Sequence, residues 1–399
     1  MDALVEKFRK KTAQVSTAFS RSLMGRIDWN VRLIGIKGAR GVGKTTLLLQ
    51  HIKKNHKTDE SVLYVSLDDI WFADNRLVDL ADDFVKRGGK HLFLDEVHKY
   101  PDWSREIKNI YDDFPETQVV FTGSSLLEIL NARADLSRRA VTYKLQGLSF
   151  REYLNFVNHT DFPIYGLNEI LERHAEISGD IANQVKPLQF FAKYLKEGYY
   201  PFFYEDLSSY HSRIQEVINH IIDAELPLLR GVDVTFSRKI KQLLLIISET
   251  APFIPNIKKI SEKTGIGRNT LISYMQYLQE ADLITHLYKS ARGISRMQKP
   301  DKIFLENSNI AYAVNPFTPD PGSLRETFFL NQLKHQHQLS YPESGDFLID
   351  DAFLVEVGGK NKPSKQLSEW PKDKAFVAAD DIEYGYANKI PLWLFGFLY

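Results

Sequence analysis

The fold is decided by the stretch Val31-Arg-Leu-Ile-Gly-Ile-Lys-Gly-Ala-Arg-Gly-Val-Gly-Lys-Thr-Thr-Leu-Leu-Leu-Gln50. It predicts a buried strand, a glycine-rich turn and the start of a helix. In the pattern G-x-x-x-x-G-K-[ST], backbone N–H groups converge on phosphate oxygens, the lysine neutralises phosphate charge and the hydroxyl reaches Mg²⁺. The expected phosphate contacts are Gly38, Ala39, Arg40, Gly41, Val42, Gly43, Lys44, Thr45 and Thr46.

The composition is that of a folded globular chain without cysteine chemistry. Its 399 residues leave room for two or three domains, and 43% hydrophobic content argues against disorder. Lys+Arg and Asp+Glu are equal at 51 each, so net charge names no partner. The absence of cysteine excludes disulfides, thiolate metal sites and a cysteine nucleophile, and it fits a reducing cytosol. We expect neither a signal peptide nor a membrane span, and therefore a cytoplasmic protein.

Strands and helices alternate through the first 150 residues. Residues 2–25 are expected to be one helix, and a further helix is expected from the glycine-rich turn to about His56. The apolar run at 61–67 is of strand type, and a helix over 77–87 follows it. This alternation predicts a parallel sheet with helices on both faces.

Two further strands are expected to end in polar residues. His91-Leu-Phe-Leu-Asp-Glu96 is an apolar strand that ends in two acids, and His98 follows in the same turn. His98 is expected either to sense a phosphate or to face solvent. The strand Gln118-Val-Val-Phe-Thr-Gly-Ser-Ser125 ends in hydroxyls, of which Ser124 is the candidate to orient a water. Ser124 is equally suited to be the N-cap of a helix over 126–131.

Two adjacent arginines, Arg138 and Arg139, precede a strand expected at the edge of this sheet. An arginine that reaches a terminal phosphate, from its own or a neighbouring subunit, stabilises transition-state charge. Arg139 is the first candidate for this role and Arg138 the second. The alternative is a salt-bridged pair on the surface.

At this point the chain resembles one prokaryotic branch of the AAA-type ATPases, whose members carry an uncharacterised C-terminal region. The resemblance lies in Lys37-Gly-Ala-Arg-Gly-Val-Gly-Lys-Thr-Thr46, Leu92-Phe-Leu-Asp-Glu-Val-His98, Phe121-Thr-Gly-Ser-Ser125, Leu148-Ser-Phe-Arg-Glu-Tyr-Leu154 and Gly198-Tyr-Tyr-Pro201. It implies ATP and Mg²⁺, with Lys44 and Thr45 as phosphate and metal contacts. It also implies Asp95 as the magnesium acid, Glu96 as the base and Ser124 as the sensor. Where the family has Ser-Gly-Arg, this chain has Ser137-Arg138-Arg139, which leaves open which arginine is the finger.

The middle of the chain predicts a helical lid over 149–232 and a winged-helix domain over 233–315. The run from Ile257 to Leu278 has a helix, glycine turn, helix pattern, with wing strands at 283–289 and 302–305. Nine Lys/Arg and four acids lie between Lys258 and Lys302. This basic segment indicates DNA binding, and the alternative is a domain that only packs against its neighbours.

The last segment, 316–399, resembles the core of the PD-(D/E)xK nucleases. A helix with Glu326 precedes a hairpin with Asp346 and Glu356, a helix is expected from Ser364, and a strand lies at 375–379. Two carboxylates across a hairpin can hold a divalent ion, and a lysine can orient water. The motif lysine would be residue 358, which is glycine, and the nearest lysine is Lys360. We therefore expect a nuclease-like fold with lost or relocated chemistry. The apolar end, 390–399, is expected to be a buried final strand or a patch for a partner.

Together these patterns predict an α/β protein in four parts. Residues 1–148 form a P-loop ATPase domain with a parallel sheet, and 149–232, 233–315 and 316–399 form the lid, the winged helix and the restriction-endonuclease-like domain. The expected function is Mg²⁺-dependent ATP hydrolysis coupled to the C-terminal region. The alternatives are a nucleotide-switched DNA-binding regulator with little turnover and a metal-dependent nuclease. A homo-oligomer or a protein partner is also compatible with the sequence.

Overall fold

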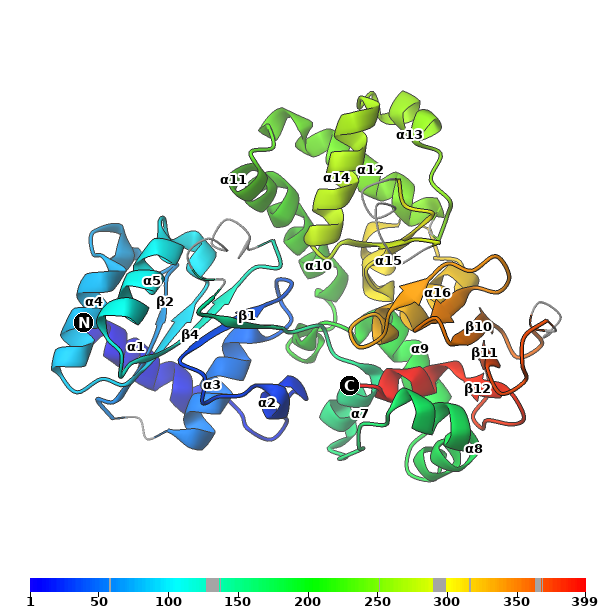
Figure 1. Ribbon diagram of the computed structural model, residues 1–399, viewed down its shortest axis with the longest axis horizontal. Coiled ribbons are helices and arrows are strands. Elements are labelled where there is room, and N and C mark those ends of the chain that lie inside the picture. The colour runs from blue at the N-terminus through cyan, green and yellow to red at the C-terminus, as the bar shows by residue number, and fades with distance from the viewer. Residues whose placement is uncertain are drawn as a thin grey trace. The chain divides into compact units, whose positions relative to one another are not determined.

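The computed structural model describes residues 1–399 except 57–58, 127–135, 137, 251, 290–298, 316, 363–366 and 368. The chain divides into two compact units, residues 1–147 and 148–399, and each is described here by itself (Figure 1). The helix expected at 126–131, Ser137, two of the basic residues (Arg292 and Arg296) and the start of the helix expected at Ser364 lie largely or wholly outside the described residues.

The first unit is built around a five-stranded parallel sheet in the order β2-β3-β4-β1-β5. This confirms the predicted parallel sheet. Its strands are β1 (Leu33–Lys37), β2 (Val62–Ser66), β3 (His91–Asp95), β4 (Gln118–Gly123) and β5 (Val141–Lys144). Strands β1, β2, β3 and β4 are continuous apolar runs, because a parallel sheet is covered by helices on both faces. All five carboxyl ends therefore meet at one edge, and the glycine-rich turn follows β1 at that edge.

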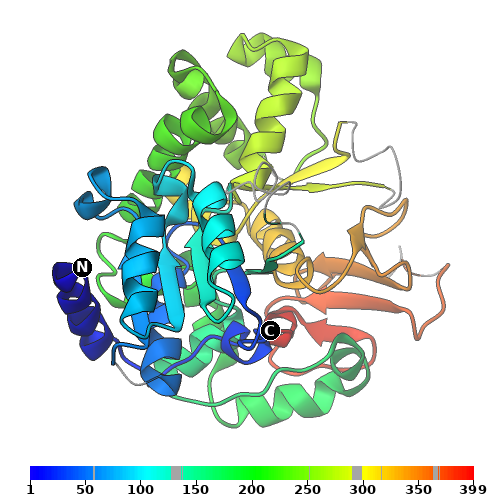
Figure 2. The ribbon, with the colours of Figure 1, turned by 60° about the vertical axis from the view of Figure 1, so that its left-hand side comes forward.

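Helices cover both faces of this sheet. They are α1 (Asp2–Gln14), α2 (Leu23–Arg26), α3 (Lys44–Asn55), α4 (Leu77–Lys86) and α5 (Trp103–Asp113), with short 3-10 turns η1 (Ile70–Ala73) and η2 (Val97–Lys99). α1 contacts α3 and β2, whereas α4 packs beside α5. Figure 2 shows α4 and α5 side by side in front of the strands. The crossover through α3, from β1 to β2, runs along the sheet in the opposite direction to those through α4 and α5, from β2 to β3 and from β3 to β4. Right-handed connections therefore place α3 on one face and α4 and α5 on the other.

The single helix predicted over 2–25 is wrong, because the chain breaks between α1 and α2. Val15 is extended, with φ −67° and ψ 130°. Side chains of α3 take up the carbonyl groups that a continuous helix would have bonded internally. Gln50 Nε2 donates to Ser16 O and Phe19 O at 2.7 and 2.8 Å, and Lys53 Nζ donates to Val15 O at 2.8 Å. The break thus ties the N-terminal segment to the helix that follows the glycine-rich turn.

The second unit begins with a group of helices. These are α7 (Phe150–Asn158), α8 (Leu167–Ala182), α9 (Pro187–Glu197), α10 (Tyr210–His220) and α11 (Leu226–Arg230), with the 3-10 turn η3 (Pro201–Tyr204) and the π-helical turn η4 (Ile221–Glu225). α7 starts with a capping box, in which Ser149 accepts from the Glu152 N–H and the Glu152 carboxylate accepts from the Ser149 N–H.

A second group of elements follows in the order helix, helix, helix, two strands. They are η5 (Val234–Phe236), α12 (Ser237–Thr250), α13 (Ile257–Thr264), α14 (Arg268–Glu280), β6 (Ile284–Leu287), β7 (Lys302–Leu305) and α15 (Ser308–Val314). β6 and β7 form an antiparallel pair. Gly265, with φ +63°, ends α13 in the left-handed conformation that glycine favours. Assignment of this group to the winged-helix class stays a prediction.

The last elements form a mixed sheet in the order β12-β11-β10-β9-β8. They are α16 (Pro321–Leu333), β8 (Leu339–Ser340), β9 (Phe347–Ile349), β10 (Phe353–Gly358), β11 (Ala375–Ala379), β12 (Lys389–Pro391) and the 3-10 helix η8 (Leu392–Phe397). β9 and β10 form the predicted hairpin, and β11 pairs parallel to β10. Nuclease-like character of this fold stays a prediction.

The apolar core of the second unit runs through the predicted domain boundaries. Phe150 and Phe191, from the expected lid, share one buried cluster with Phe328, Phe347 and Trp393 of the C-terminal segment. The chain end is neither a long strand nor an exposed patch. β12 has three residues, and η8 is buried in this cluster. Tyr399 O accepts from Ser149 Oγ at 2.6 Å, which ties the chain end to the start of α7. The division of this unit into three domains stays a prediction.

Within the described ranges, no helix is both long and apolar enough to cross a membrane.

A cluster of imidazoles in the first unit makes its stability sensitive to acid. His51 stacks on Trp29 with ring centroids 3.5 Å apart, and its Nε2 lies 3.4 Å from His56 Nε2. Burial, followed by repulsion from His56 and His91, lowers the pKa of His51 to about 4. The unfolded imidazole, with its ordinary pKa near 6.5, takes up a proton first as the pH falls. Stability is therefore unaffected above about pH 7 and is lost as the pH falls toward 4.

We expect His51→Phe, which keeps an aromatic ring against Trp29, to remove part of this acid sensitivity. At pH 5 relative to pH 7.5, the wild type should lose about 1 kcal/mol more stability than the variant. Urea unfolding followed by tryptophan fluorescence at both pH values measures this difference. Equal losses in the two proteins would show that His51 is not the sensitive group.

Candidate active site

The glycine-rich turn has the backbone geometry that a phosphate-binding loop requires. Gly41 and Gly43 have φ of +85° and +97°, which residues with a β carbon rarely adopt. At Gly38 a β carbon would lie 2.3 Å from the carbonyl oxygen of Leu145, which follows β5. Glycine at 38 is therefore needed for the loop to approach this backbone. The residues fit a triphosphate, because glycine at 38, 41 and 43 lets the loop backbone wrap closely, and the loop leads into the N-terminus of α3.

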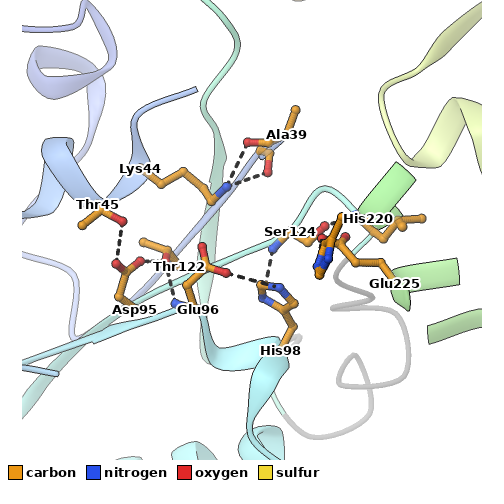
Figure 3. A network of polar contacts seen from close by, with 12 residues as sticks. Ala39, Lys44, Thr45, Asp95, Glu96, His98, Thr122, Ser124, His220 and Glu225 are labelled. Atoms are coloured by element: carbon orange, nitrogen blue, oxygen red, sulfur yellow. Dashed lines mark hydrogen bonds and ion pairs between the residues drawn. The ribbon is translucent and has the colours of Figure 1, made fainter. Parts of the chain in front are cut away.

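Lys44 is 5% exposed, and its ammonium group is turned into the loop (Figure 3). Nζ donates to Gly38 O at 2.9 Å and to Ala39 O at 3.0 Å. A buried ammonium must be hydrogen-bonded, and here the loop carbonyls supply the acceptors. The same position allows Nζ to neutralise phosphate oxygens held by the loop. This is where the sequence predicted the lysine.

Asp95 lies at the end of β3, is 2% exposed and is surrounded by hydroxyl groups. Thr45 Oγ1 donates to Asp95 Oδ2 at 2.6 Å, and Tyr64 OH donates to the same oxygen at 2.8 Å. Thr122 Oγ1, from β4, donates to Asp95 Oδ1. Burial raises the pKa of Tyr64 well above its usual range, and the charge of Asp95 adds to this effect. Tyr64 thus remains a donor that holds the carboxylate in place.

The pair formed by Thr45 and Asp95 has the donor chemistry of a magnesium site. Mg²⁺ prefers hydroxyl and carboxylate oxygens and commonly uses few protein ligands together with phosphate oxygens and waters. The distance between the two side chains shows that the fold brings them together from separate elements. Within the described residues, no group of three or more His, Asp and Glu side chains could hold a metal ion by itself. The pair formed by Thr45 and Asp95 therefore fits a magnesium ion that takes its other ligands from phosphate oxygens and waters.

Glu96 follows Asp95 in a left-handed backbone conformation, with φ +55° and ψ +40°. Such a conformation is uncommon for a residue with a side chain and must be held by its surroundings. The Glu96 N–H donates to Thr122 Oγ1 at 3.1 Å, which supplies that support. Its carboxylate lies beside His98, with Glu96 Oε2 3.4 Å from His98 Nε2.

His98 is buried, so the expected alternative of a solvent-facing histidine is wrong. The Ser124 N–H donates to His98 Nδ1 at 3.4 Å. Ser124 Oγ accepts from the Leu126 N–H at 3.4 Å, and a capping role stays a prediction because the helix expected at 126–131 lies largely outside the described residues. A role of Ser124 as a phosphate sensor stays a prediction.

The two arginines lie away from the glycine-rich turn. Arg139 pairs with Asp112 of α5, through Nε–Oδ1 and Nη2–Oδ2 distances of 3.0 and 3.1 Å. Arg139 lies just before β5, and Asp112 lies near the end of α5, which leads into β4. This ion pair is therefore at the edge of the parallel sheet where its strands start, opposite the glycine-rich turn. This agrees with the alternative of a surface salt bridge. Arg138 is exposed. A finger role acting on a neighbouring subunit stays a prediction.

The candidate site in the second unit contains a different lysine from the one predicted. Lys362 Nζ lies 3.2 Å from Glu356 Oε1, whereas Lys360 is exposed and its carbonyl accepts from Lys389. A β carbon on Gly358 would lie 2.7 Å from Lys362 Cδ, so this side chain covers the place of the missing motif lysine. Asp346 Oδ2 accepts from the Val357 N–H at 2.8 Å.

Glu326 of α16 belongs to the same charged cluster. Its carboxylate lies 2.5 Å from Lys302 Nζ. Burial raises the pKa of Glu326, the nearby positive charges of Lys302 and Lys362 oppose this, and the charge of Asp346 adds to it. The sequence predicted Asp346 and Glu356 together with Lys360, whereas the structure places Lys362 beside Glu356. Spacing along the chain does not show how far a lysine side chain extends.

One comparison, with a family of protein domains, agrees with the geometry of the first unit. Residues 30–154 match a family described as "AAA domain". This part of the chain, called the AAA domain below, is similar to that family and includes the glycine-rich turn, Asp95 and Glu96. Residues 188–321 match a family described as "Domain of unknown function (DUF8612)", which assigns no activity to them. No curated protein matches the chain.

Solved structures show only distant similarity. The Orc1 protein of Aeropyrum pernix in complex with DNA is 12% identical, with 77% of this chain and 91% of that chain covered and a TM-score of 0.31. AMPPCP-bound DnaA from Aquifex aeolicus is 16% identical, with coverages of 65% and 86% and a TM-score of 0.26. The Hsp104–ADP complex of S. cerevisiae is 15% identical, with coverages of 70% and 41% and a TM-score of 0.32. TM-scores this low do not carry a ligand or partner over to this chain.

Arg21 supports the AAA domain's loop from outside the recognised motifs. It is 7% exposed, and its Nη1 donates to Val42 O at 2.7 Å. Its Nη2 donates to Gln146 O and Gly147 O at 2.7 and 2.8 Å. One guanidinium therefore joins the glycine-rich turn to the segment that follows β5. Sequence reasoning missed it because Arg21 lies in no motif and precedes the loop by two elements.

We expect Arg21→Ala to weaken ATP binding by about tenfold or more, because three backbone acceptors lose a charged donor and the loop loses its support. Arg26→Ala is the matched control, since Arg26 is exposed in the neighbouring helix α2. Titration calorimetry with ATP measures both variants. Unchanged affinity in a folded Arg21→Ala protein would remove this residue from the site.

Proposed function

We propose that the AAA domain binds ATP with Mg²⁺ and hydrolyses it, and that its nucleotide state is coupled to residues 148–399. The observation that carries this proposal is the 2.6 Å contact between Thr45 Oγ1 and Asp95 Oδ2 beside the buried ammonium of Lys44. Two motifs separated by β2, α4 and β3 converge there with the residue types that MgATP chemistry requires.

The roles follow from position. The loop N–H groups and Lys44 would hold the β- and γ-phosphates, and Thr45 and Asp95 would hold the magnesium ion directly or through water. When bound, the ion neutralises charge that develops on the transferred phosphoryl group. Tyr64 and Thr122 keep the Asp95 carboxylate oriented, so that little reorganisation is needed when the nucleotide binds.

Glu96 is the residue best placed to take the proton of the attacking water. Its side chain is 29% exposed, so water has access to it, while its backbone is fixed by Thr122. A carboxylate can act as a general base when it is held within hydrogen-bond reach of the water. The proposal also includes a sensor role for Ser124. It further includes assembly into an oligomer, in which Arg139 or Arg138 of one subunit would reach the nucleotide of the next.

Two substitutions separate binding from hydrolysis. Lys44→Ala should abolish ATP binding, because the loop loses the buried ammonium that is turned into it to neutralise phosphate charge. Glu96→Gln should keep ATP affinity within about twofold and lower turnover by at least about a hundredfold, in line with the loss of a general base. Calorimetry and phosphate release measure the two effects. Tight binding by Lys44→Ala, or undiminished turnover by Glu96→Gln, would contradict the assigned roles.

A second candidate function is metal-dependent cleavage of DNA in the second unit. The observation that favours it is that Lys362 contacts Glu356 and covers Gly358, so the motif lysine is replaced in space. The β9–β10 register, extended by one residue, sets Asp346 opposite Glu356. Residues in such cross-strand positions share one face of the hairpin. Two carboxylates and a lysine are a sufficient set for metal-assisted hydrolysis of a phosphodiester.

DNA would reach this unit through the basic segment 258–302. Lys258, Lys259 and Lys263 of α13 and Arg268 of α14 are all exposed. Exposed cations on neighbouring helices suit contacts with a phosphate backbone. This segment also supports the alternative of a nucleotide-switched DNA-binding regulator, in which DNA is bound and not cut.

Plasmid DNA incubated with the protein and Mg²⁺ or Mn²⁺ distinguishes these possibilities on one gel. Cleavage by the wild type and by the matched control Lys360→Ala, but not by Lys362→Ala, is the result that the nuclease predicts. A plasmid that is retarded at low salt but stays intact would contradict the nuclease and support the DNA-binding regulator. An intact plasmid without retardation would contradict both.

A further inference from the structure

His98 connects two parts of the AAA domain's site that come from different strands. It lies in η2, just after β3, and its ring is buried. On one side Nε2 lies 3.4 Å from Glu96 Oε2, and on the other Nδ1 lies 3.4 Å from the backbone nitrogen of Ser124, at the end of β4. Figure 3 shows the imidazole between these two residues. The ring therefore bridges the candidate base and the neighbouring strand end.

The hydrogen-bonding roles fix which ring nitrogen carries the proton. A backbone N–H can only donate, so Nδ1 must accept from Ser124. A neutral imidazole with an accepting Nδ1 carries its proton on Nε2, the nitrogen that faces the Glu96 carboxylate. Ser124 thus selects the tautomer whose Nε2–H faces the Glu96 carboxylate. The 3.4 Å separations are long for hydrogen bonds, as such contacts often are before a substrate binds.

We propose that His98 is a positioning residue for ATP hydrolysis, which holds the Glu96 carboxylate and links it to the end of β4. This inference rests on the ATPase function proposed above. The Glu96 backbone is held by the contact from its N–H to Thr122 Oγ1, and the imidazole of His98 lies against its carboxylate. A displacement of the β4 end would move Ser124, turn the imidazole and redirect the carboxylate. The ring itself touches neither the phosphates nor the attacking water in this role.

Two substitutions separate the two contacts of the ring. His98→Asn keeps an acceptor near the position of Nδ1, for Ser124, but cannot reach Glu96. His98→Gln places an amide N–H near the position of Nε2, on the side that faces Glu96. We expect His98→Asn to lower kcat by about tenfold or more with ATP affinity within about twofold of wild type, because orientation of a base is worth that much. His98→Gln should recover most of the lost kcat.

The measurements are kcat from phosphate release, the Kd for ATP from calorimetry and the thermal midpoint of each variant. A kcat for His98→Asn equal to that of wild type would overturn the inference. Equal losses in kcat for Asn and Gln variants, each accompanied by a lower thermal midpoint, would also overturn it in favour of a packing role. Failure of the ATPase proposal is a different outcome, since wild type and Glu96→Gln would then be equally inactive.

Discussion

A buried carboxylate at the end of β3 is the constraint on which the rest of the site depends. Asp95 cannot be taken from water unless its oxygens are satisfied, and hydroxyls from three other elements do this: Thr45 of α3, Tyr64 of β2 and Thr122 of β4. These donors come from both neighbouring strands and from the helix after the glycine-rich turn. Their hydrogen bonds to the Asp95 carboxylate therefore hold three elements together. The same set orients Asp95 toward the place where a magnesium ion would meet Thr45.

The glycine-rich turn packs closely against the backbone that follows β5. Gly38 lies against the carbonyl of Leu145, and Arg21 joins Val42 to the segment after β5. The edge strand β5 is therefore part of the site even though it carries none of the motif residues. Glu96 stands in a left-handed conformation that Thr122 supports, and its side chain meets His98. Strain at this position is maintained by the surrounding hydrogen bonds, as is common at functional sites.

The sequence was most informative where local pattern and chemistry coincide. Lys44, Thr45 and Asp95 were predicted as site residues because the glycine spacing is distinctive and an acidic strand end follows it downstream, and the structure places Thr45 against Asp95. Tyr64, Thr122 and Arg21 were missed because each acts through a contact that depends on strand register or on a folded loop, and none lies at a recognisable spacing. The single helix over 2–25 was wrong because side chains of α3 compete for its carbonyl groups.

In the second unit, secondary structure was predicted better than its packing. The β9–β10 hairpin and β11 were found, yet the apolar end forms a short strand and a buried 3-10 helix within a core shared with α7 and α9. Long-range burial of this kind leaves no periodic signal. Lys362, four residues after Gly358, reaches Glu356 by the length of its side chain, which spacing rules that count only along a strand do not capture.

The central claim is that this constellation is a magnesium-dependent ATPase site. Release of phosphate from ATP by the wild-type chain, measured with Mg²⁺ and again with excess EDTA, tests it most directly. The account predicts steady release with Mg²⁺ and none with EDTA, because Thr45 and Asp95 would act through the ion. The same rate with and without the chelator, or no release under either condition, would contradict it.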